Sequence, residues 1–123
     1  MILVDTSVWI SFLRNSDPDL TAILKSYLKR KEIYAVSAVF GELLQGVKNK
    51  RERELVVTLW ENLPAVDETD LFIHAGNLSN EHKFYAHGIG LIDCYILAAA
   101  LRNDLGLWTL DKKLGEAADS LAR

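Results

Sequence analysis

One acidic side chain in this sequence lies where a charge is costly. Asp93 is the only charged residue within residues 91–101, a run that reads Leu-Ile-Asp-Cys-Tyr-Ile-Leu-Ala-Ala-Ala-Leu and that should be buried as a helix. An ionised carboxylate in a dry interior costs several kcal/mol unless it is protonated, paired with a base or facing a cation. No Lys or Arg lies within a helical turn of Asp93. A bound cation is therefore one explanation for this residue.

Three further acids lie at comparable places, each shortly after an apolar run that is predicted to be a strand: Asp5, Glu42 and Asp111. If the four acids converge, each raises the proton affinity of the others, because like charges a few ångströms apart repel. A divalent cation would compensate them. An all-oxygen ligand set completed by water suits Mg²⁺ or Mn²⁺ better than zinc. The pattern therefore predicts a metal site held by these four carboxylates.

A carboxylate-held Mg²⁺ stabilises charge on phosphoryl oxygens and lowers the pKa of a bound water, which together support phosphodiester hydrolysis. Hydroxyl groups lie beside two of the acids, on Thr6, Ser7 and Thr109. They can orient a carboxylate or a metal-bound water. Helix capping or turn formation is the alternative use of these hydroxyls.

Short apolar runs alternate with amphipathic stretches along the chain, which predicts an α/β fold. Strands are expected at residues 1–4, 33–36 and 106–110, with a brief one at 65–66. Helices are predicted over residues 8–13, 20–28, 37–47, 55–63, 70–86 and 91–101, and after residue 111. Such alternation implies a parallel sheet covered by helices on both faces, and ligands gather at the carboxyl ends of its strands.

The overall composition is that of an ordinary globular protein. We expect one domain spanning residues 1–123, near the commonest domain size. The 14 basic and 17 acidic residues give a net charge of −3. A strongly basic domain would indicate nucleic-acid binding, and this mildly acidic charge does not. A single cysteine, no recognisable signal peptide and no long apolar stretch predict a cytoplasmic protein that does not enter the membrane.

The sequence around the four acids resembles a known family. The motifs are Val-Asp-Thr-Ser-Val-Trp-Ile at residues 4–10, Glu-Leu-Leu-Gln-Gly at 42–46, Asp-Cys-Tyr-Ile-Leu-Ala-Ala at 93–99 and Trp-Thr-Leu-Asp at 108–111. Their order and context resemble those of the PIN-domain ribonucleases, and the chain length resembles that of the VapC-type toxins of bacterial and archaeal toxin–antitoxin pairs. The resemblance covers nearly the whole chain.

The resemblance implies a PIN-like three-layer α/β/α fold, with a short central parallel sheet flanked by helices. It also implies Mg²⁺- or Mn²⁺-dependent endonucleolytic cleavage of RNA, inhibition by a small cognate antitoxin protein, and a homodimer. By position, Asp5, Glu42, Asp93 and Asp111 become the catalytic, metal-binding acids, and Thr109 becomes the supporting catalytic hydroxyl. In the last motif the family often carries a further acid or His, and then an aromatic residue, where this chain has Lys113 and Leu114.

Two other functions remain open from the residues alone. Asp5 after an apolar strand also suits a phosphatase or phosphotransferase that forms a covalent acyl-phosphate, although that chemistry would want a second acid at the position of Ser7. A binding module is the third alternative, with the acids holding a structural ion or none. Taken singly, Asp93 could be a hydrogen-bonded structural acid, Glu42 a solvated helix residue and Asp111 a helix cap.

Basic and aromatic side chains near the acids also have two interpretations. Lys112 and Lys113 are candidates to contact a phosphate, with a solvated helix face as the alternative. The basic stretch at residues 48–53 favours the solvated interpretation. Trp9 and Phe12 are predicted to pack in the core, with an oligomer or antitoxin groove as the alternative.

Overall fold

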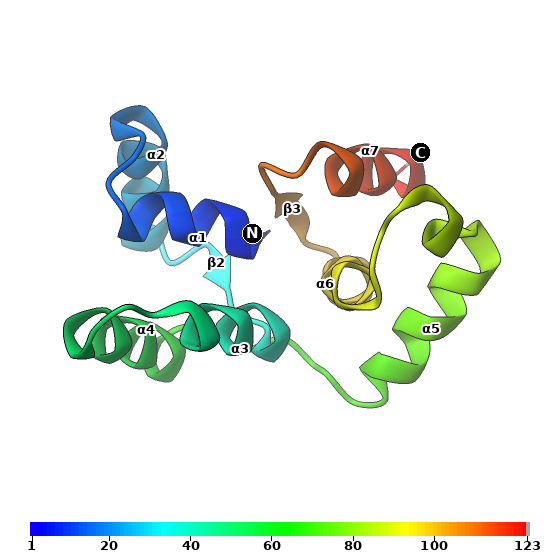
Figure 1. Ribbon diagram of the computed structural model, residues 1–123, viewed down its shortest axis with the longest axis horizontal. Helices are drawn as coiled ribbons and strands as arrows, with labels where there is room; N and C mark the ends of the chain where they lie inside the picture. The colour runs from blue at the N-terminus through cyan, green and yellow to red at the C-terminus, as the bar shows by residue number, and fades with distance from the viewer. Residues whose placement is uncertain (123) are drawn as a thin grey trace.

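The computed structural model describes residues 1–122 and contains a small parallel sheet surrounded by helices (Figure 1). The strands are β1 (Ile2–Val4), β2 (Ile33–Tyr34) and β3 (Gly106–Trp108), in the order β2-β1-β3. Both pairings are parallel, with Ile2 opposite Ile33 on one side and Gly106 on the other. The carboxyl ends of the three strands therefore lie at one edge of the sheet.

The described part of the chain forms seven α-helices and one short 3₁₀ helix. They are α1 (Thr6–Leu13), α2 (Pro18–Lys29), α3 (Ser37–Gly46), α4 (Lys50–Asn62), α5 (Leu71–His82), η1 (Phe84–His87), α6 (Leu91–Arg102) and α7 (Lys112–Leu121). In Figure 1, α1 and α2 lie on one side of the strands, and α5 and α6 lie on the other. This arrangement confirms the predicted three-layer α/β/α fold.

Helix α6 lies at the centre of the helical packing. It contacts α3, α5, α7 and β3. Ile96, Leu97 and Ala99 on this helix are essentially inaccessible to solvent, as the continuous apolar run predicted. Cys94 is also buried and unpaired, and its burial raises the pKa of the thiol, which keeps it neutral. Asp93 is thus held by a helix that packing fixes from several directions.

Three predicted elements were longer than the structure shows. The strand expected at 33–36 ends at Tyr34, and the brief strand expected at 65–66 is a single parallel bridge between Ala35 and Ala65. The strand expected at 106–110 ends at Trp108, whose carbonyl accepts a bond from the Asp5 amide. After that bond the strand pairing ends, because the backbone amide of Leu110 donates to the Ser7 hydroxyl oxygen.

The helix expected over residues 70–86 is also wrong at its C-terminal end. Lys83 adopts a left-handed conformation with φ of 57°, which ends α5 at His82 and separates it from η1. The spacing of the apolar residues does not indicate this break, because Phe84, which follows it, is also buried in the core. Gly88 then takes φ of +78° at the end of η1.

Glu68, in the loop before α5, ties two site-bearing helices together. Its carboxylate accepts bonds from the Ser37 hydroxyl at 2.5 Å and the Ser37 amide at 3.0 Å, at the start of α3. It also accepts a bond from the Tyr95 hydroxyl of α6, at 2.5 Å. Val36 is the N-cap residue of α3, and the Ser37 hydroxyl bonds Glu68 rather than a backbone group of the helix. This clamp fixes α3 against α6.

No helix within residues 1–122 has the length and apolarity needed to cross a bilayer.

Candidate active site

Asp5 is the most buried of the four predicted acids. It follows β1 directly, and its side chain is 5% exposed. Although it occupies the N-cap position of α1, its carboxylate caps no backbone amide of that helix. Its Oδ2 instead accepts bonds from the Ser7 hydroxyl at 2.9 Å and from the Thr109 hydroxyl at 2.7 Å. Two hydroxyls therefore fix the orientation of this carboxylate.

The same two hydroxyls join distant segments of the chain. The Leu110 amide donates to the Ser7 hydroxyl oxygen at 3.0 Å, and the Asp111 amide donates to the Thr109 hydroxyl oxygen at 3.0 Å. Each hydroxyl thus donates to Asp5 and accepts from the segment that follows β3. This exchange holds the ends of β1 and β3 together, and with them Asp5 and Asp111.

Asp111 does cap a helix, as one interpretation of the sequence held. Its Oδ1 accepts a bond from the Leu114 amide at 3.0 Å, at the start of α7. The side chain is exposed, and this bond uses one oxygen of the carboxylate. The other oxygen remains available to a ligand.

Glu42 is exposed on α3 and is tied to the start of α1. Its Oε1 accepts a bond from the Thr6 hydroxyl at 2.7 Å. Thr6 comes immediately after Asp5, so this bond holds Glu42 at the same edge of the sheet. The pairing was not foreseen, because Thr6 was grouped by sequence with Asp5 and Asp111 rather than with Glu42.

Asp93 lies in the first turn of α6 and is partly buried. Burial is the main cause that raises the pKa of its carboxyl, and the negative charges of Asp5, Asp111 and Glu42 raise this pKa further. A weaker backbone hydrogen bond involving Gly90 acts in the opposite direction. Since all three other acids act on Asp93, the structure brings the four predicted residues to one site.

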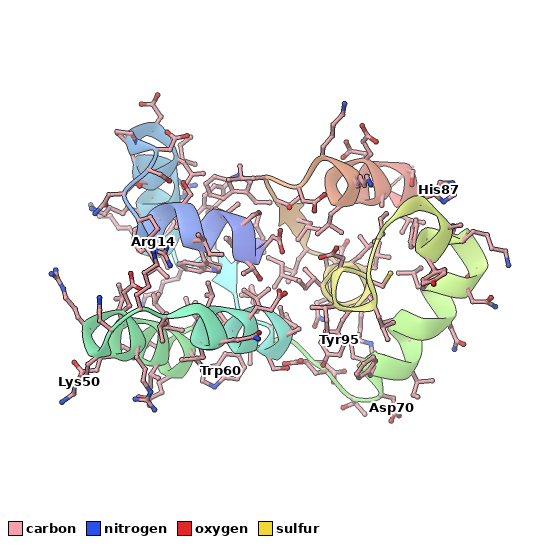
Figure 2. The ribbon with its side chains drawn as sticks, in the orientation of Figure 1. Arg14, Lys50, Trp60, Asp70, His87 and Tyr95 are labelled. Atoms are coloured by element: carbon pink, nitrogen blue, oxygen red, sulfur yellow. The ribbon has the colours of Figure 1, made fainter. Side chains whose placement is uncertain are left out.

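None of the basic side chains that the structure describes forms an ion pair with these acids. The ion pairs formed within residues 1–122 are Arg14–Glu52 at 3.6 Å, Arg30–Glu32 at 3.2 Å and Lys50–Glu54 at 3.8 Å, so none includes any of the four acids. Figure 2 shows Arg14 and Lys50 on the side of the molecule formed by α1 and α4. The carboxylates consequently form a locally uncompensated negative site.

The donor set is chemically suited to a hard divalent cation. Mg²⁺ and Mn²⁺ prefer oxygen ligands, which carboxylates supply. Within the described residues, no three His, Cys, Asp or Glu side chains are grouped tightly enough to form a ready-made ligand set. Mg²⁺ does not need one, because proteins usually bind it through one or two carboxylates, with water and substrate phosphate in the remaining positions. The residues present therefore fit such an ion.

Comparison with known proteins identifies the family. Residues 2–120 match the PIN-domain family model. The chain belongs to the PIN-domain family. It is 34% identical over 121 residues to Ribonuclease VapC32 of Mycobacterium tuberculosis, in strains H37Rv and CDC 1551, a match that covers 95% of this chain and 90% of the relative. The resemblance to VapC-type PIN-domain proteins is thereby confirmed.

A solved structure supports the fold of this PIN-domain protein. The crystal structure of FitAcB from Neisseria gonorrhoeae superimposes with a TM-score of 0.61. The match covers 97% of this chain and 94% of the other, at 24% sequence identity. The three-layer arrangement is thus shared with a protein whose sequence has diverged widely.

Proposed function

We propose that this PIN-domain protein is a metal-dependent endoribonuclease, acting in the cytoplasm as the toxin of a toxin–antitoxin pair. Membership of the family and the similarity to a protein named Ribonuclease VapC32 support the activity. The observation that carries the metal dependence is that burial, and then the charges of Asp5, Asp111 and Glu42, raise the pKa of Asp93, with no ion pair to a base among residues 1–122. All of this chemistry would reside in one domain, residues 1–123.

In this proposal Asp5, Glu42, Asp93 and Asp111 hold Mg²⁺ or Mn²⁺. When bound, the ion would supply positive charge for the phosphoryl oxygens and a more acidic water. Thr109 and Ser7 keep the Asp5 carboxylate in one orientation through their bonds to Oδ2. Water attacks the phosphorus and the bond from phosphorus to the leaving sugar oxygen breaks. The phosphate keeps the hydroxyl of the water, the leaving oxygen takes up the other proton, and no side chain acts as a nucleophile.

The test is cleavage of a single-stranded RNA by purified protein. We expect cleavage that requires added Mg²⁺ or Mn²⁺, stops with a chelator, and is lost in Asp93→Asn. Asp119→Asn is the matched control, because it removes an exposed acid on α7 outside the proposed metal site. Undiminished cleavage by Asp93→Asn would contradict the proposal, and a covalent acyl-phosphate on Asp5 would favour the phosphatase alternative.

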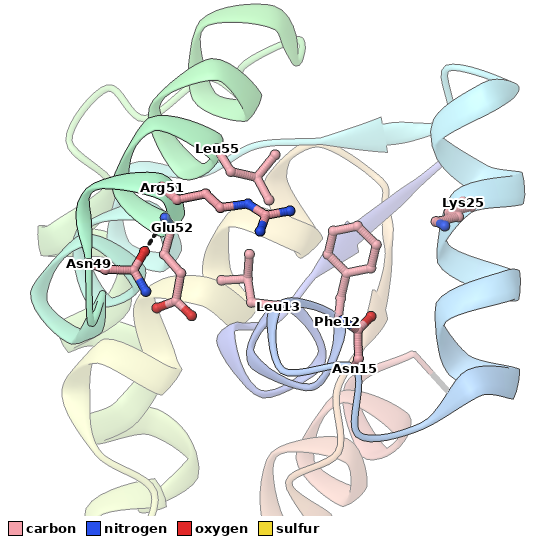
Figure 3. A pocket seen from close by; sticks show the side chains of 8 residues that line it. All are labelled: Phe12, Leu13, Asn15, Lys25, Asn49, Arg51, Glu52 and Leu55. Carbon is pink, nitrogen blue, oxygen red and sulfur yellow. Dashed lines mark hydrogen bonds between the residues drawn. The ribbon is translucent and has the colours of Figure 1, made fainter.

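The proposed antitoxin needs a docking surface, and the structure offers a suitable cavity of about 320 Å³ (Figure 3). It lies between α1, α2 and α4. Figure 3 shows Phe12 of α1 and Arg51 of α4 pointing toward the same space, with Leu55 beside them. Lys25 of α2 completes the lining on the opposite side. An antitoxin segment with an apolar side chain next to an acid would complement this cavity, and Arg51→Glu should weaken its binding.

A homodimer is the second partner arrangement that we propose. The support is a pair of exposed apolar side chains at the start of α5, where Phe72 is 54% and Ile73 is 70% exposed. Apolar groups gathered at a surface favour association. Light scattering should show a dimer that Ile73→Asp shifts toward monomer, and a monomeric wild type would contradict this arrangement.

A further inference from the structure

A second hollow, of about 450 Å³, lies between η1 and α7. Its lining includes His82, Phe84 and His87 on the η1 side, and Lys113, Glu116 and Ser120 on α7. We call this hollow the α7 groove. The α7 residues are spaced by three and four positions, so they follow one face of that helix. Figure 2 shows His87 next to α7, in agreement with this lining.

Two residues that line the α7 groove are close in the chain to acids of the proposed site. Lys113 follows Asp111 by two residues, and Ile89, which also lines the groove, precedes Asp93 by four. From Lys113 to Ser120 the groove runs along α7 for roughly 10 Å, at about 1.5 Å per residue. A strand of nucleic acid with one phosphate at the acids would therefore continue into the groove.

Lys113 supplies a positive charge to the lining of the α7 groove. Its side chain is exposed, and it forms no ion pair with any residue that the structure describes. The ammonium group packs over Gly88, where an added Cβ would lie 2.8 Å from Nζ. Gly88 thus leaves room for the ammonium at the mouth of the groove. A free lysine ammonium beside a hydrolytic site is suited to a phosphate.

The η1 side of the groove offers an aromatic surface. The His82 ring stacks on Phe84 with ring centroids 5.3 Å apart and an interplanar angle of 19°. Phe84 is buried, which fixes the stack, whereas His82 is exposed. Single-stranded RNA is commonly bound by stacking its bases on such side chains.

Two hydrogen-bond acceptors complete the lining. Nδ1 of His87 donates to the Lys83 carbonyl at 2.9 Å, so Nε2 of the neutral ring is left as an acceptor. The Glu116 carboxylate is a second acceptor. Amino groups of bases and the 2′-hydroxyl of ribose are the matching donors.

We infer that the α7 groove binds the nucleotide next to the scissile bond of a single-stranded RNA. Lys113 contacts its phosphate, the base stacks on His82, and Glu116 accepts a hydrogen bond from a base amino group. The inference rests on the proposed function and adds to it a substrate subsite formed by side chains outside the four acids.

Binding measured without cleavage tests the inference. In an Asp93→Asn background, fluorescence anisotropy gives the Kd of a single-stranded RNA oligonucleotide as a function of salt. Lys113→Gln should raise the Kd at least about fivefold and reduce the slope of log K against log salt by about 0.7, as for one lost phosphate contact. Lys112→Gln is the matched control, because its lysine is exposed on the same helix turn but does not line the groove. Equal effects of the two substitutions would overturn the inference.

A second pair of variants tests the stacking surface. His82→Ala should weaken RNA binding by about fivefold or more, the loss typical of one base–aromatic stack. His74→Ala removes an exposed histidine that lines a different cavity, and it should leave the Kd unchanged. If His82→Ala binds RNA as His74→Ala does, the subsite is wrong.

Failure of the subsite and failure of the proposed function are distinguishable. A wild-type protein that cleaves no RNA with Mg²⁺ or Mn²⁺ contradicts the proposed function, whatever the groove binds. A wild-type protein that cleaves RNA, while Lys113→Gln and Lys112→Gln bind it equally, contradicts only the subsite.

Discussion

Thr109→Val is the substitution whose effect the structure specifies most closely. It removes the hydroxyl that donates to the Asp5 carboxylate at 2.7 Å and accepts from the Asp111 amide at 3.0 Å. Valine has nearly the same shape as threonine, so no cavity is created. The change in stability therefore reports these two hydrogen bonds.

The expected loss follows from the two bonds. A hydrogen bond to a charged group contributes about 1.5–3 kcal/mol, and a neutral one about 0.5–1.5 kcal/mol. Because Asp5 is only 5% exposed, water replaces the lost donor poorly. We expect Thr109→Val to lower the free energy of unfolding by about 2–4 kcal/mol. At about 4 °C per kcal/mol for a protein of this size, the melting temperature should fall by roughly 8–16 °C.

Thr21→Val provides the matched control. The Thr21 hydroxyl oxygen is buried and has no hydrogen-bond partner among residues 1–122. Removing such a group should leave stability unchanged or increase it by about 1 kcal/mol. Urea unfolding at pH 7, followed by fluorescence of the three tryptophans, gives both values. Equal stabilities of the two variants would refute the claim that Thr109 positions Asp5.

Three more outcomes are expected. The folded state raises the pKa of Asp93, so ionisation of this carboxyl lowers the stability of the wild type at pH 7. Asp93→Asn should therefore unfold at a higher urea concentration than the wild type at pH 7. The difference should vanish below the ordinary carboxyl pKa of 3.8, where Asp93 is protonated in both the folded and the unfolded state. Mn²⁺ at about 100 times its Kd should stabilise wild type by about 2.7 kcal/mol in thermal unfolding, and Asp5→Asn/Asp93→Asn should show no such gain. Glu68→Gln should lose about 1–2 kcal/mol in urea unfolding, whereas Glu81→Gln, at an exposed position of α5, should lose little.

The sequence was sufficient to predict the layers and the approach of the segments that carry Asp5 and Asp111. Short apolar runs identify the strands, and parallel strands place their carboxyl ends at one edge, so Asp5 and Asp111 must approach each other. The apolar run around Asp93 likewise predicted a buried helix, because a helix that is apolar on every face avoids water only when it is buried. These inferences rest on hydrophobic burial, which composition and spacing record directly.

The bonds that fix the site could not be predicted in the same way. The pairing of Thr6 with Glu42 and the clamp of Glu68 on Ser37 and Tyr95 join segments that are far apart in the chain. A polar side chain forms hydrogen bonds with the groups that lie near it in the folded protein, and its neighbours in the sequence do not specify those groups. The α7 groove has the same origin, since it forms only where η1 and α7 face each other.

The central claim is that four carboxylates jointly hold a divalent cation. Titration with Mn²⁺, monitored by electron paramagnetic resonance of the free ion, tests it without reference to any RNA. We expect saturable binding of at least one ion per chain by wild type and by the Asp119→Asn control, and its loss in Asp5→Asn/Asp93→Asn. Absence of saturable binding by wild type, or equal binding by the folded double variant, would contradict the claim.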